Sequence, residues 1–208
     1  GKRASPPGLD PMTAQNIQAV YSLANATDRA QGTAWYPAAK AAAQALTDAY
    51  GVRLEVAIGV IAALSPRNRW ERNLADAESL IKVYRVDPES AANVKVCTFG
   101  KNKAKALQIL ALTDANWDSV LAILSGPKLR EFASCIMGDD QEVCIDGHAY
   151  SVWLGDRVTV ANVPSIGVKL RRTIKADYQA AAKALGVPAS TVQAITWCAW
   201  RRIHGVTA

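Results

Sequence analysis

Lys128 and Asp146 are the two residues whose types and setting suit them for chemistry, and they lie 146 − 128 = 18 positions apart. Lys128 follows a short break at Gly126 and Pro127 and opens a predicted helix. Asp146 ends a short apolar stretch that comes after a turn at 138–140. A turn between the two segments would bring an amine and a carboxylate toward each other. We therefore expect the pair to act on one substrate atom.

The elements that position this pair are predicted to be helices, so the sequence predicts an all-α fold. Alanine is abundant, alternating β-branched runs are scarce, and apolar residues recur at helical spacing. The segment 56–64 is almost continuously apolar, which predicts a helix buried on most of its sides. Thr13 is expected to cap the first helix, and Pro37 to lie in the first turn of the second. The predicted helices are 13–26, 37–50, 56–64, 71–83, 102–112, a short helix ending at 124, 128–137, 147–154, 177–185 and 190–203.

The 208 residues suit one compact unit folded as two helical lobes. Residues 1–11 are rich in Pro and Gly, and we interpret them as a tag or a disordered arm. A terminal lobe is predicted from 12–55 plus 150–208. A central lobe, 56–149, then carries both Lys128 and Asp146.

The charge of the chain is compatible with a polyanionic partner. Lysine and arginine total 24 against 18 acidic residues, which gives a net charge of +6. Each basic cluster is by default a solvated helix face, but several clusters could meet one phosphate track. The clusters lie at 67–72, 101–105, 169–175 and 201–202.

Composition argues against a membrane span and against a metal centre. No apolar run approaches the roughly 20 residues that a membrane helix needs. The four cysteines are far apart and form no CxxC pair, so we expect reduced thiols rather than zinc or iron–sulfur ligands. We expect a cytoplasmic monomer without metal, cofactor or membrane partner, located in the host cell if the protein is phage-encoded.

The segment 125–153 resembles the core of the helix-hairpin-helix DNA glycosylases, the superfamily of endonuclease III and the 8-oxoguanine glycosylases. In that family a hairpin ending in G-x-K leads into a helix, and a V-D-x-H stretch follows at a similar separation. The matching stretches here are 126–128 and 145–148. Upstream, the run EVAIGVIAALSPRNRWERNLADAESLI is similar to the family's buried helix, loop and next amphipathic helix, and 100–104 is similar to its helix start before the hairpin. The resemblance therefore covers about half of the chain in the family's order.

The resemblance implies a helix-hairpin-helix motif, a DNA-binding cleft between the lobes, and a DNA glycosylase with abasic-site lyase activity. Lys128 would attack the sugar C1′ and leave a Schiff base, and Asp146 would stabilise the positive charge that develops on the sugar. His148 would support these two residues rather than act as a base. The partner would be double-stranded DNA with a damaged or modified base that is turned out of the stack.

The resemblance also implies contacts with DNA. The loop after the buried helix matches the place where the family inserts a plug into the duplex, which makes Arg67 or Asn68 the plug residue. Backbone amides near Gly126 would hold a phosphate. Trp153, Trp197 and Trp200 are expected to be core or lobe-contact residues. The predicted DNA contacts are Ser65, Arg67, Asn68, Arg69, Lys101, Lys103, Gly126, Arg201 and Arg202.

The sequence departs from the family in ways that leave two other functions open. The family hairpin L-P-G-x-G is matched by 122–126 with only its second glycine, Cys198 stands alone where iron–sulfur ligands would be, and nothing after Leu154 matches. One alternative is a phage-type DNA base hypermodification transferase, in which the same lysine and aspartate would join an amine to an activated pyrimidine. The other is a DNA-binding relative without catalysis.

Overall fold

A computed structural model describes residues 11–206, and all of their regular structure is helical. The all-α prediction is confirmed for these residues. The predicted arm 1–11 lies outside the described residues except for Pro11, the first residue of α1.

Packing divides the chain into two compact units, which we call the terminal unit and the central unit. The terminal unit is Gly1–Tyr36 plus Gly138–Ala208, and the central unit is Pro37–Met137. The order is discontinuous, as in the predicted lobes, but the boundaries lie at 36/37 and 137/138 rather than at 55/56 and 149/150. As a result, Asp146 and His148 belong to the terminal unit.

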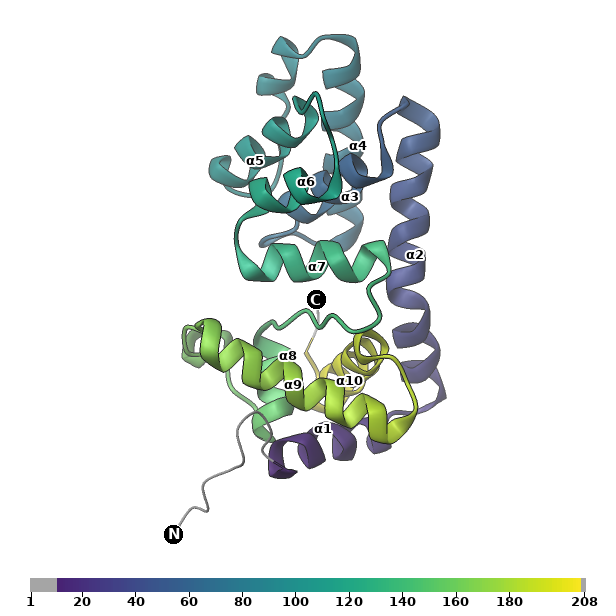
Figure 1. The fold of residues 1–208 in the computed structure, drawn as a ribbon, viewed down its shortest axis with the longest axis vertical. Helices are drawn as coiled ribbons and strands as arrows, with labels where there is room; N and C mark the ends of the chain where they lie inside the picture. Colours follow the sequence, from purple (N-terminus) through teal and green to yellow (C-terminus); the bar gives the residue numbers. More distant parts are fainter. Residues whose placement is uncertain (1–10, 207–208) are drawn as a thin grey trace. The chain divides into compact units, whose positions relative to one another are not determined.

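The terminal unit contains α1 (Pro11–Leu23), the first part of α2 (Ala26–Tyr50), α8 (Gly147–Leu154), the 3₁₀ turn η2 (Val160–Asn162), α9 (Val168–Leu185) and α10 (Ala189–His204) (Figure 1). Its core holds Tyr178 and Ile174 of α9 together with Val143 and Ile145 of the segment before α8, all at most 1% exposed. These contacts explain why the stretch that leads to Asp146 packs in this unit.

Two contacts tie the terminal unit together. The fully buried Asp177 accepts hydrogen bonds through Oδ2 from the Thr13 hydroxyl (2.5 Å) and from Trp153 Nε1 (2.7 Å), which joins α9 to α1 and α8. On α2, Gly32 faces the backbone of Ile195 on α10 so closely that a Cβ at Gly32 would lie 2.6 Å from the Ile195 Cα. These two helices can cross here only because residue 32 has no side chain.

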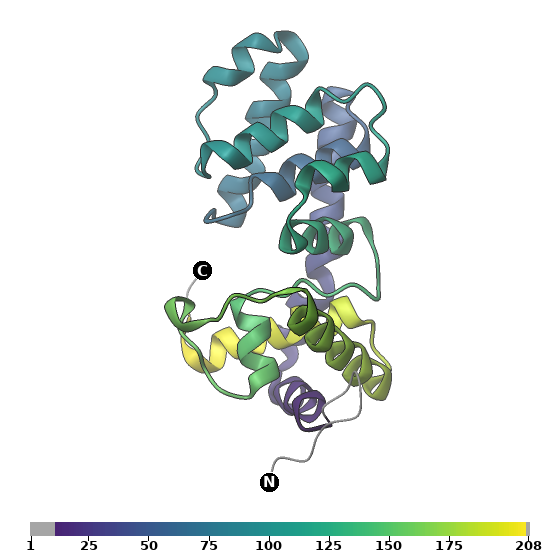
Figure 2. The ribbon, with the colours of Figure 1, turned by 60° about the vertical axis from the view of Figure 1, so that its left-hand side comes forward.

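The central unit contains the rest of α2 and α3 (Leu54–Ala63), α4 (Trp70–Val86), the 3₁₀ turn η1 (Glu89–Asn93), α5 (Gly100–Leu110), α6 (Trp117–Leu124) and α7 (Pro127–Met137); Figure 2 shows these helices from a second direction. Helix α3 is buried from Val56 to Ala63 and contacts α4, α5, α6 and α7. The prediction of a helix buried on most sides, ending before Ser65, is confirmed.

Three predicted boundaries are wrong, each for a local reason. Thr13 is not a cap, because α1 begins at Pro11 and the Thr13 hydroxyl bonds to Asp177. Pro37 lies inside α2 rather than in a first turn, because α2 begins near Asn25 and Asp28, whose side chains accept each other's backbone N–H at 2.8 and 3.0 Å.

The third wrong boundary belongs to α9, which begins at Val168 and not at 177. Its added turns carry Lys169, Arg171 and Arg172, whose charge obscured the helical period of Ile174 and Tyr178.

Candidate functional site

Helices α6 and α7 form a hairpin whose connection is Ser125 and Gly126 alone. Ser125 has φ 55° and ψ −49°, and the Gly126 N–H donates to the Leu124 carbonyl at 2.6 Å, which is the geometry of a γ-turn. From α5, Lys105 Nζ donates to the same carbonyl (2.9 Å) and to Ser125 Oγ (3.2 Å). The hairpin thus lies at the predicted residues, and a lysine of a third helix holds its turn.

Lys128 is the second residue of α7 and is exposed. Pro127 takes the first helical position, where the missing N–H of a proline costs nothing. The buried face of α7 carries Ala133 and Ile136, and α7 packs against α3. The Lys128 amine is therefore accessible at the start of a helix that is fixed from its other side.

Asp146 is the N-cap of α8 and is half-buried. Its Oδ1 accepts a hydrogen bond from the Ala149 N–H at 2.8 Å, so the carboxylate satisfies one of the free amides of the first turn. The preceding residue, Ile145, is 1% exposed, and Arg171 Nη1 donates to its carbonyl at 3.2 Å. The carboxylate is held in one orientation by backbone and core contacts.

Tyr178 is the core residue whose pKa is affected by the charge of the Asp146 carboxylate. The tyrosine is fully buried, and its hydroxyl donates to the Ala149 carbonyl at 3.0 Å. Burial raises the pKa of Tyr178 far above its ordinary value, and the negative charge of Asp146 raises it further. The Tyr178 hydroxyl is thus a neutral donor under α8.

The structure places Lys128 in the central unit and Asp146 with His148 in the terminal unit. Each residue lies at or near the start of a helix, as the sequence predicts. That the amine and the carboxylate meet at one nucleotide stays a prediction.

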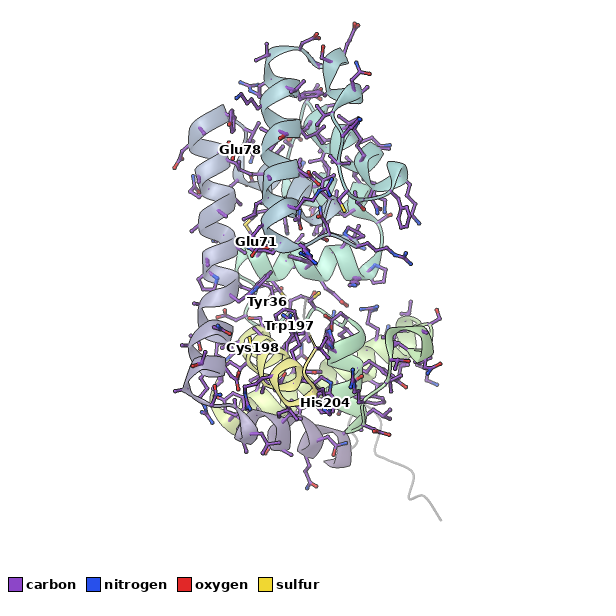
Figure 3. All side chains as sticks on the ribbon, turned by 180° about the vertical axis from the view of Figure 1, so that it is seen from behind. Tyr36, Glu71, Glu78, Trp197, Cys198 and His204 are labelled. Atoms are coloured by element: carbon purple, nitrogen blue, oxygen red, sulfur yellow. The ribbon has the colours of Figure 1, made fainter. Side chains whose placement is uncertain are left out.

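His148 lies in an aromatic cluster of the terminal unit. Its ring centroid is 6.2 Å from that of Trp197, and the Arg201 guanidinium lies 4.3 Å from the centre of the same indole. Trp197, Cys198 and His204 lie along α10 (Figure 3). The indole of Trp197 thus joins a predicted supporting residue of α8 to a predicted DNA contact of α10.

The loop between α3 and α4 carries the predicted plug. Arg67 is exposed and has a φ of 51°, a backbone conformation that residues other than glycine seldom adopt. Ser65 bonds to the Ala62 carbonyl (2.7 Å), and Asn68 Nδ2 donates to the Leu64 carbonyl and to Asp76, both at 3.1 Å. Asn68 and Ser65 therefore build the loop, and Arg67 is the residue that it presents to solvent.

Phe99 and Asp76 both contact the α3–α4 loop, and neither was predicted from the sequence. Phe99 is 52% exposed, and its ring lies 5.3 Å from the guanidinium carbon of Arg67. Asp76 is buried on α4 and accepts bonds from Asn68 and from the Cys97 N–H (3.0 Å), which ties the two loops together. The available signal for Phe99 was an aromatic residue directly before the basic helix start at Gly100.

Some of the other cations predicted to contact DNA are exposed, and others are bound to groups of the protein itself. Arg69 and Lys101 are exposed at the starts of α4 and α5. Lys103 donates to the carbonyls of Ala92 (2.6 Å) and Val94 (2.5 Å) and so holds the segment around η1.

Arg202 is likewise engaged inside the terminal unit. It pairs with the buried Asp28 at 2.9 Å and donates to the Leu23 carbonyl at 2.9 Å. Arg202 and Lys103 therefore both bind groups of their own unit. Arg69, Lys101 and Arg201 remain the better candidates for contacts with DNA phosphates.

Within 11–206, no three His, Cys, Asp or Glu side chains are placed to hold a metal ion. Cys97 is exposed, whereas Cys135 and Cys144 are buried. None of the helices in this range is long and apolar enough to cross a membrane.

Two of the hollows on the described residues belong to the terminal unit. The larger, about 860 Å³, is an open surface groove between the end of α9 and the loops near Gln141 and Pro188. The smaller, about 140 Å³, lies beside His148 and Trp200. The smaller hollow includes a residue of the predicted site, and the larger includes none.

A model described as a family of unknown function (DUF7178) matches residues 3–204, almost the whole chain. The chain belongs to this family. No curated protein and no solved structure matches it.

Proposed function

We propose that this DUF7178 protein is a DNA glycosylase with abasic-site lyase activity. The observation that carries the proposal is that Lys128 lies in the first turn of α7, directly after a tight helical hairpin, while Asp146 caps α8. These are the positions that the resemblance to helix-hairpin-helix glycosylases requires of the nucleophile and the carboxylate. The reaction further requires a DNA substrate that reaches both units.

The chemistry uses each residue in a defined way. The neutral amine of Lys128 forms a bond to the sugar C1′, and the base leaves with the electrons of the glycosidic bond and takes up a proton. The C1′–O4′ bond then breaks, and O4′ takes up the proton that the amine nitrogen releases, which gives the Schiff base. Loss of a proton from C2′ of this Schiff base breaks the bond between C3′ and its phosphate oxygen. Asp146, fixed by its bond to the Ala149 N–H, stabilises the positive charge on the sugar as the base departs.

Helix starts supply the proposed contacts with phosphates. The first turns of α5, α7 and α9 contain no acidic residue, and each contains lysine or arginine. Free N–H groups and the helix dipole favour an anion at such an end, and adjacent cations strengthen that preference. Since Gly126 uses its N–H within the turn, the amides of Lys128 and Leu129 are the proposed phosphate donors of the hairpin.

Arg67 and Phe99 form the proposed element that enters the duplex. Both are exposed, and they lie against each other on two loops that Asp76 joins. An apolar ring inserted between base pairs unstacks them, and an arginine beside it contacts the strand backbone. This surface would stabilise the gap that a turned-out nucleotide leaves.

Borohydride trapping tests the proposal directly. Wild-type protein is incubated with duplexes that carry oxidised, deaminated, alkylated or phage-type modified bases, and the Schiff base is reduced to a stable crosslink. We expect crosslinking to at least one duplex, and K128A is expected to reduce it by at least ~100-fold through loss of the nucleophile. K82A, which removes an exposed lysine of α4, is the matched control and should crosslink like wild type.

Two outcomes would reject the proposal. Crosslinking that survives in K128A would show that another amine reacts. DNA binding without crosslinking to any duplex of the panel would favour the transferase or the non-catalytic DNA-binding protein over the glycosylase.

A further inference from the structure

The smaller hollow of the terminal unit has the size of a single aromatic ring. Its volume is about 140 Å³, close to the ~150 Å³ cavity that holds one benzene molecule in a protein core. A six-membered ring fits this volume. The lining residues are His148, Arg157, Val158, Thr159, Trp200 and Val206.

The walls of this hollow are held by hydrogen bonds. Ser151 of α8, which is 1% exposed, accepts the N–H of Val158 at 3.2 Å and fixes the segment that carries Arg157 and Thr159. At the other wall, Gly205 ends α10 in the left-handed conformation, and the Val206 N–H donates to the Arg201 carbonyl at 2.9 Å. The hollow is therefore a formed feature of the folded unit.

The lining combines an aromatic face with hydrogen-bond donors. Trp200 is 7% exposed and packs against His204 with ring centroids 4.1 Å apart, so its indole is a fixed aromatic wall of the hollow. An arginine can only donate hydrogen bonds, and the hydroxyl of Thr159 and the imidazole of His148 can donate as well. Such a set suits a ring whose edge carries carbonyl oxygens.

We infer that this hollow binds a pyrimidine with carbonyl substituents, of the uracil and thymine type, and that it receives the base on which the protein acts. The inference rests on the proposed function for the claim that the ring comes from DNA. It depends on the hollow alone for the size and the polarity of the ring. His148 lies on the same helix start as Asp146, which places the ring site and the proposed carboxylate at one end of α8.

Saturation-transfer NMR on the intact protein tests the inference with free bases. We expect transfer from protein to uracil and thymine, at least tenfold weaker transfer to cytosine, and none to adenine. V206W should reduce the transfer to uracil at least tenfold, because the indole would fill the hollow from its C-terminal wall. V168W introduces the same side chain at a residue that is 76% exposed and outside the hollow, and it should bind uracil like wild type.

Adenine binding equal to uracil binding would overturn the inference, as would V206W that is folded by circular dichroism and still binds uracil. T159V keeps the shape of the hollow and removes one hydroxyl, so it should weaken uracil binding severalfold if that hydroxyl contacts the ring.

Two results separate this inference from the proposed function. Uracil binding without borohydride trapping on any duplex would reject the glycosylase and keep the pyrimidine site. Trapping that is equally efficient on purine and pyrimidine lesions would keep the glycosylase and reject the pyrimidine site.

Discussion

The helix starts that carry Lys128 and Asp146 are built in opposite ways. At α8, a side chain caps the helix, a buried tyrosine lies beneath it, and Arg171 holds the carbonyl before the cap. At α7, a proline opens the helix after a γ-turn, and the contact from outside the hairpin is made by Lys105. The carboxylate is fixed by the fold, whereas the amine is exposed to solvent.

This difference suits the two proposed roles. A group that stabilises charge is most effective when it is already oriented before the reaction, since no reorganisation is then needed. A nucleophile must travel toward the carbon that it attacks, and a lysine at an exposed helix start has the freedom to do so. The comparison therefore predicts rigid geometry around Asp146 and a Lys128 whose surroundings form only with substrate.

The largest effect is expected from removing the charge of Asp146 while keeping its cap. Asparagine caps helices as well as aspartate does, so D146N should leave the free energy of unfolding nearly unchanged and reduce base excision by at least ~100-fold. D146A should lose excision and also about 1 kcal/mol of stability. Single-turnover excision and urea unfolding measure the two effects. D146N with wild-type excision would show that Asp146 is only a cap.

Tyr178 tests how closely the start of α8 is tied to the core. Its pKa in the folded state lies above the ordinary value, so the hydroxyl stabilises the fold below about pH 10 and loses about 1.4 kcal/mol of that contribution for each pH unit above it. Y178F lacks this group, and its stability should fall less than that of wild type between about pH 10 and pH 11. Urea unfolding of both proteins at these pH values measures the difference. Parallel loss of stability would contradict the burial of a neutral hydroxyl next to Asp146.

Lys105 tests the other helix start. K105M removes the ammonium that holds Leu124 and Ser125, and we expect a loss of about 1 kcal/mol in stability. We also expect faster exchange of the Ser125 and Arg130 amides, which donate to the Leu121 and Gly126 carbonyls in the wild-type protein. K82M changes an exposed lysine outside the hairpin and serves as control. If the amide exchange rates are unchanged in K105M, the hairpin turn is stable without the hydrogen bonds from Lys105.

Gly126 is expected to give the smallest effect. A Cβ on this residue meets only the Leu124 carbonyl at 3.9 Å, and its φ is not in the left-handed region, so G126A should change stability by less than about 0.5 kcal/mol. DNA affinity in a binding titration should also be unchanged, because the Gly126 N–H is already used in the turn. A large loss of affinity would show that a phosphate approaches this residue directly.

The helices around the proposed site could be predicted from the sequence because their signals are local. Asn116 caps α6 through a bond to the Ser119 N–H, Gly155 ends α8 in the left-handed conformation, and the apolar run of α3 is buried. Each of these depends on residues within a turn or two of the chain. By contrast, the start of α2 depends on a reciprocal bond between Asn25 and Asp28, and its passage through Pro37 depends on packing along the helix.

The contacts of the candidate site could be predicted less well, because they join distant parts of the chain. Lys103 and Arg202 look like surface cations in sequence, yet their partners Ala92 and Asp28 lie in other elements. The role of Asp76 as a common acceptor for two loops likewise depends on how the central unit packs. Charge clusters alone cannot separate cations that hold the fold from cations that are accessible to DNA.

The close approach at Gly32 also restricts which residues homologues of this protein can have at this position. Since the obstacle includes the backbone of Ile195 as well as its side chain, no change of side chain at position 195 can make room for a larger residue at position 32. Homologues that keep this helix crossing should therefore be invariant at this glycine, while position 195 is free to drift among apolar residues. A homologue with any other residue at position 32 would have moved α10, and with it Trp197 and Trp200.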